Sequence, residues 1–165
     1  MNTWSGQYQY RGAGDRNYKA GTPKGSKSNV MELVSKLVSG LRDGDFVTVI
    51  QTINNPSGDE QKGSQNNNIF RSDTQGKTAL YKLMQTVRGF SEDCKDNDDS
   101  KSCSKAVAKI YASISAVASR QSRSDVLKVI KGVFEGYVIR GDGADLKKRL
   151  NNFLVFLELV VANVR

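Results

Sequence analysis

The chain has 165 residues, which is enough for one folded domain with its own core. It carries 25 Lys and Arg against 17 Asp and Glu, a formal charge of +8, and contains no histidine. The commonest general base and metal ligand is therefore missing, and we expect neither an enzyme nor a bound metal or cofactor.

The start of the chain and the longest apolar runs bear on where the protein works. Residues 1–10 lack the basic and apolar segments of a secretory signal, and no run of about 18 apolar residues predicts a membrane span. We expect an intracellular protein, cytoplasmic or in a virion, that is not secreted by a signal peptide.

Positive charge is concentrated at both ends of the chain: the net charge is +4 over residues 1–30, −2 over 31–104 and +6 over 105–165. Such a field attracts polyanions.

Residues 1–28 are predicted to form a flexible basic arm, because they contain almost no aliphatic side chains. Trp4 and three tyrosines alternate with basic residues, among them Arg11, Arg16 and Lys19. This composition suits base stacking beside phosphate neutralisation. Two alternatives remain open: a tail that only keeps the protein soluble, and an arm whose aromatic rings dock on a neighbouring subunit.

The first helix is expected to begin at Asn29, which can cap it, and to end at Gly44. Its apolar side chains recur at helical spacing: Val30, Val34, Leu37, Val38 and Leu41. Asp45 can cap a second, shorter helix over 46–53, although the β-branched residues there also suit a strand. Residues 54–76 are polar and predict a long loop.

A third helix is predicted from about Thr78 to Gly89, with one inward face: Leu80, Tyr81, Leu83, Met84 and Val87. Residues 91–104 form the most acidic stretch and predict a solvated loop without the ligand pattern of a calcium site. Cys94 and Cys103 flank this stretch, and both a disulfide and two free thiols are compatible with the sequence.

Three further helices follow. The fourth contains Val107 to Ala118, and the fifth begins after the capping residue Ser124. Asp142 is the expected cap of the last helix, in which apolar residues cover most of the circumference from Phe153 onward. That helix is either central in the fold or a subunit contact, and the residues outside its main stripe are candidate oligomer contacts: Val155, Phe156 and Leu159.

These elements predict an all-α fold, a bundle of five to six helices over residues 29–165. Two arrangements remain open, because the acidic loop 91–104 separates helices at 29–90 from helices at 105–165. The helices can form one bundle or two small sub-lobes. In either case the basic arm at 1–28 lies outside the core.

Basic residues near the helix joints in the second half of the chain are the candidate nucleic-acid contacts: Arg120, Arg123, Lys128, Lys131, Lys147, Lys148 and Arg149. With antiparallel helices they form a stripe, which suits a polymer. The leading hypothesis is a non-enzymatic protein that binds RNA, single-stranded or structured, without sequence preference and self-assembles. A viral coat or nucleocapsid protein, or an RNA-sequestering suppressor of silencing, has this character. The alternative is an intracellular interaction module, an effector or adaptor, that docks through its apolar C-terminal helix.

Overall fold

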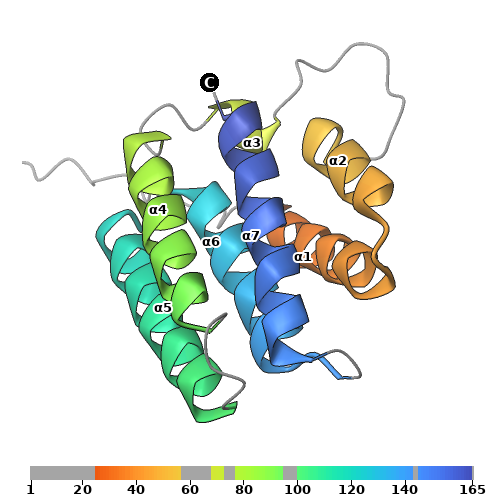
Figure 1. Cartoon of the computed structure of the whole chain (residues 1–165). Helices are drawn as coiled ribbons and strands as arrows, with labels where there is room; N and C mark the ends of the chain where they lie inside the picture. Colours follow the sequence, from red (N-terminus) through yellow and green to blue (C-terminus); the bar gives the residue numbers. More distant parts are fainter. Residues whose placement is uncertain (1–24, 57–67, 73–76, 95–99, 143–144, 165) are drawn as a thin grey trace, which may run out of the picture.

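The computed structural model describes residues 25–56, 68–72, 77–94, 100–142 and 145–164, and over these ranges it is an all-α bundle without strands (Figure 1). This confirms the predicted fold class. The elements are α1 (Gly25–Asp43), α2 (Phe46–Asn54), α3 (Ile69–Ser72), α4 (Lys77–Asp93), α5 (Ser100–Arg120), α6 (Asp125–Val133), the π-helical turn η1 (Phe134–Ile139) and α7 (Leu146–Asn163).

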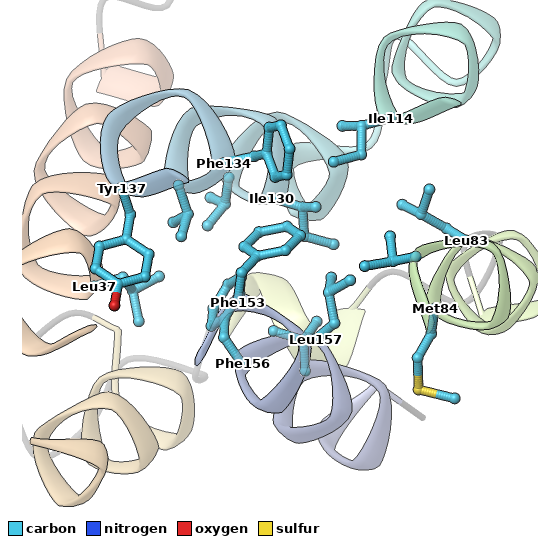
Figure 2. Close-up of a cluster of buried hydrophobic side chains, with 14 of the residues drawn as sticks. Leu37, Leu83, Met84, Ile114, Ile130, Phe134, Tyr137, Phe153, Phe156 and Leu157 are labelled. Carbon is cyan, nitrogen blue, oxygen red and sulfur yellow. The ribbon is translucent and has the colours of Figure 1, made fainter. Parts of the chain in front are cut away.

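α7 has neighbours on several sides, which is one of the two roles that its apolar stretch from Phe153 onward left open. It packs against α4, α2 and η1, with smaller contacts to α3 and α5. Phe153 and Phe156 are fully buried, and the Phe153 ring meets Phe134 edge-on at 4.9 Å between centroids. Figure 2 shows both α7 rings pointing into a cluster to which α4, α5 and α6 also contribute.

Helices from both halves of the chain share this core. α1 packs mainly on α6 and α2, while α4 packs on α5 and α7. Leu37 of α1, Leu83 of α4 and Ile130 of α6 belong to the same buried cluster (Figure 2). The segments 29–90 and 105–165 therefore do not have separate cores in the described residues.

The contact between α1 and α6–η1 depends on two glycines one turn apart. A Cβ atom added to Gly132 would lie 2.9 Å from Val34 Cγ2, and one added to Gly136 would lie 3.1 Å from Val38 Cγ2. Val34 and Val38 are four residues apart on α1, so both valines face the glycine surface. The absence of two side chains lets the helix backbones approach closely.

The joint between α1 and α2 follows the sequence signals closely. Gly44 has φ +71°, a left-handed conformation that favours glycine and ends α1. Asp45 then caps α2 by accepting hydrogen bonds from Thr48 N at 3.0 Å and Thr48 Oγ1 at 2.5 Å. These bonds hold the pKa of Asp45 below its ordinary value of 3.8. The helical interpretation of 46–53 is confirmed.

Some predicted helix ends are wrong. α1 begins at Gly25, so Asn29 lies inside the helix and not at its cap. α4 continues through Gly89 to Asp93, since packing on α5 and α7 outweighs the local preference of one glycine. The cap of α7 is Asp145, whose side chain accepts from Lys147 N at 3.3 Å, and not Asp142. Ser124 caps α6 as predicted.

Two side-chain placements also differ from the sequence pattern. Tyr81 is 53% exposed, although it was expected on the inner face of its helix. The predicted loop 54–76 contains α3, and Phe70 there is completely buried. Asn68 fixes this turn because its amide donates to the carbonyls of Ile53 and Asn54, while its Oδ1 accepts from Phe70 N at 3.0 Å.

Cys94 and Cys103 form a disulfide between the end of α4 and the first turns of α5. Both residues are buried. The predicted acidic loop is shorter than 91–104, because α4 and α5 extend into it, and residues 95–99 lie outside the described part of the chain. Disulfides are typical of oxidising compartments, whereas the composition favours an intracellular protein, so the cellular location stays a prediction.

Candidate functional site: a basic pocket between α4 and α5

A pocket of about 220 Å³ lies between the N-terminal half of α4 and the C-terminal half of α5. These two helices run side by side in opposite directions (Figure 1). Eight side chains line the pocket: Ala79, Lys82, Leu83, Thr86, Ser113, Val117, Arg120 and Gln121. It combines an apolar floor with two cations and three neutral polar groups.

Lys82 and Arg120 supply the positive charge of this pocket, and both are exposed. Lys77, in the first turn of α4, and Arg123, just after α5, belong to the same end of the helix pair. None of the ion pairs found among the described residues involves these four cations. These four cations lie at one end of the α4–α5 pair, which we call the basic end: Lys77, Lys82, Arg120 and Arg123.

The predicted stripe continues onto α6, where the charges are offset locally. Lys128 Nζ lies 2.7 Å from Asp125 Oδ1, and Lys131 Nζ lies 3.8 Å from Glu135 Oε1. Glu135 also accepts a hydrogen bond from the hydroxyl of Tyr111 at 2.9 Å. Both lysines thus have acidic neighbours within one helical turn, and their contribution to an anion-attracting surface is smaller than that of the basic end.

Arg149 has a structural position that the sequence pattern did not reveal. Its Nη1 donates to the carbonyl of Val138 at 2.9 Å and to the carbonyl of Gly141, and its Nε is buried. The last carbonyls of a helix lack partners within it, and Arg149 satisfies one of them, that of Val138, at the end of η1, together with the carbonyl of Gly141 just beyond it. Nη1 is therefore engaged within the chain, and the assignment of Arg149 as a nucleic-acid contact stays a prediction. Lys148 is exposed and Lys147 is half-buried.

The three arm residues Arg11, Arg16 and Lys19 lie outside the described residues, so their assignment stays a prediction.

The three candidate oligomer contacts on α7 differ in their exposure to solvent. Phe156 is fully buried in the core of its own chain and cannot contact a second copy. Val155 is 41% exposed and Leu159 is half-buried, so only these two remain available on α7.

Lys77 and Lys82 are the two cations of the basic end that the sequence pattern did not single out. Lys82 lies on a helix of which only the apolar face was considered, and Lys77 lies one residue before the predicted start of that helix. Their significance depends on the antiparallel packing of α4 on α5, which brings residues 77–82 beside residues 117–121. The helical period alone does not supply that pairing.

We found no protein family, curated protein or solved structure that matches this chain. None of the helices in the described ranges is long and apolar enough to cross a bilayer. Over the same ranges, no group of three or more Cys, Asp or Glu side chains is arranged to hold a metal ion. The geometry and charge of the basic end are consequently the features of the chain that bear on its function.

Proposed function

We propose that this protein binds RNA without strong sequence preference and has no catalytic role, with the basic end as its contact in the folded domain. The observation that carries the proposal is the gathering of Lys77, Lys82, Arg120 and Arg123 on one helix pair without an acidic partner among the described residues. Phosphate groups are the anions that such a surface binds most readily along a polymer. The net charge of +8 supports the same partner.

The predicted arm extends this proposal. Residues 1–24, which precede α1 in the chain, contain four basic side chains and four Trp or Tyr rings, and the fifth basic residue of the predicted arm, Lys27, belongs to α1. Phosphate contacts by the arm add to those of the folded domain, and the aromatic rings add stacking on bases. A coat or nucleocapsid protein and an RNA-sequestering protein both need this combination. Self-assembly is part of the proposal, with Val155 and Leu159 as the contacts that α7 still offers.

The alternative, a protein-interaction module that docks through its last helix, loses support from the packing. Most of the apolar residues that suggested docking are buried inside the bundle: Leu150, Phe153, Phe156, Leu157 and Val160. Among the large apolar residues of α7, Val155 is exposed and Leu159 is half-buried. RNA binding is therefore the function that the structure favours.

The test is RNA affinity of the variant Arg120→Gln/Arg123→Gln, measured by fluorescence anisotropy over a salt series. Each lost phosphate contact lowers the slope of log affinity against log salt by about 0.7 for a single strand, so we expect the slope to fall by about 1.4. Lys36→Gln/Arg42→Gln is the matched control, because it removes two charges from α1, which packs on α2, α6 and η1 (Figure 1). Equal slopes for the two variants would contradict the proposed surface.

A further inference from the structure

The pocket at the basic end differs from a flat phosphate-binding surface because it has an apolar floor. Ala79 and Leu83 of α4 and Val117 of α5 form that floor, while Lys82 and Arg120 bring cations to the same space. Lysine and arginine on a flat surface are sufficient to bind phosphates. An apolar floor beside those cations suits a ligand that carries both an anionic group and an apolar face.

The neutral polar groups of the pocket are mainly acceptors. The hydroxyl of Thr86 donates to the carbonyl of Lys82 at 2.9 Å, and that of Ser113 donates to the carbonyl of Lys109 at 3.0 Å. Their protons are thus used within their own helices, and their oxygens remain able to accept. Gln121 adds an amide that both donates and accepts. The pocket consequently offers cationic donors, neutral acceptors and one amide around an apolar surface.

We propose that this pocket takes one unpaired nucleotide of the bound RNA, with the base on the apolar floor and the adjoining phosphates at Lys82 and Arg120. This inference rests on the proposed function and names its substrate as single-stranded RNA. The edge of a base carries donors and acceptors that match Gln121 and the two hydroxyl oxygens. The guanidinium of Arg120 can also stack on a base, a contact common in recognition of unpaired RNA.

The size of the pocket suits an unpaired base better than a base within a duplex. Its volume of about 220 Å³ is below the roughly 300–1,000 Å³ of pockets for drug-sized ligands, so it holds one small ring system. Bases in a duplex are stacked and paired, and extruding one costs a few kcal/mol. Unpaired bases do not need to be extruded. The pocket therefore favours single strands, while the basic end by itself attracts both forms.

The test is a substitution that fills the pocket without changing the charge of the protein. Ala79→Phe adds a ring at the floor, and Ala108→Phe adds the same ring at an exposed position of α5 outside the pocket. Binding is measured to an oligouridylate, to an abasic ribose-phosphate strand of equal length and to a duplex of equal length. We expect Ala79→Phe to weaken oligouridylate binding about tenfold, the order expected for loss of one bound base, and to leave abasic-strand binding unchanged. Ala108→Phe should leave all three unchanged.

The other outcomes separate the two proposals. If Ala79→Phe binds oligouridylate as tightly as the wild type while Arg120→Gln/Arg123→Gln binds it weakly, the nucleotide pocket is wrong and the RNA-binding function stands. If the wild type binds none of the three strands, both proposals fail.

A second measurement does not depend on the variant folding. Photo-crosslinking of a thiouridine oligonucleotide to the wild type should place adducts on residues 79–86 or 113–121. Adducts confined to other segments would overturn the pocket.

Discussion

Replacing Gly132 by alanine tests the close contact between α1 and α6. The new Cβ would lie 2.9 Å from Val34 Cγ2 and 3.2 Å from Val34 Cγ1, so the valine or the helix must shift. Such overpacking typically costs about 1–3 kcal/mol. Alanine in a helix interior gains up to about 1 kcal/mol over glycine, which offsets part of that cost. We therefore expect Gly132→Ala to lower the free energy of unfolding by up to about 2 kcal/mol.

Gly89→Ala is the matched control, because Gly89 is also helical and a Cβ added there meets no atom within 4 Å. This variant should raise the free energy of unfolding by up to about 1 kcal/mol. Urea unfolding followed by circular dichroism at 222 nm measures both. The difference between the variants isolates the overpacking at Val34 from the helix propensity that they share.

A rescue completes the test. Val34→Ala removes the two Cγ atoms that the new Cβ would strike. In that background Gly132→Ala should stabilise the protein about as much as Gly89→Ala does. If Gly132→Ala is already as stabilising as Gly89→Ala in the wild-type background, the close approach of α1 to α6 is refuted.

Three further predictions concern the core, a helix end and a cap. Phe156→Ala should lower the free energy of unfolding in urea by about 3–5 kcal/mol, because the ring is fully buried. A small change in that free energy together with a smaller assembly would instead identify Phe156 as a subunit contact. Arg149→Met should lower unfolding stability by about 1–3 kcal/mol, because the carbonyls of Val138 and Gly141 lose their donor; an unchanged melting temperature would contradict that role. The pKa of Asp45 is lowered in the folded state, so its stabilising contribution is present above pH 3.8 and is lost as pH falls through the folded-state pKa. The stability difference between wild type and Asp45→Asn should therefore shrink on acidification over that range, and a difference independent of pH would count against the cap.

Much of the fold could be predicted from patterns among residues that are close together in the sequence. The period of apolar residues in the last helix predicted a helix with neighbours on several sides, and α7 has them. Gly44, Asp45 and Ser124 marked helix ends because left-handed backbone and side-chain caps depend on adjacent residues only. The ends that were missed, at Asn29 and Gly89, are places where helix continues past a plausible stop or start signal.

Less of the candidate site than of the fold could be predicted from the sequence. Arg120 and Arg123 were predicted as phosphate contacts, and the structure places them at the basic end. Lys82 was missed because its relation to Arg120 is set by how two helices pack. The carbonyl contacts of Arg149 were missed for the same reason. Its exposed neighbour Lys148 and its own charge suggested a surface role, while its hydrogen-bond partners are carbonyls eight and eleven residues earlier in the chain.

By itself, the sequence determined the all-α class, most helices and their inward faces, because helical periodicity and capping act over a few residues. The tertiary structure alone decided which helices are neighbours, and with that the shared core, the burial of Phe156, the capping role of Arg149 and the pocket between α4 and α5. Which residues of a helix are buried depends on the helices that pack against it, and those helices are distant in the chain.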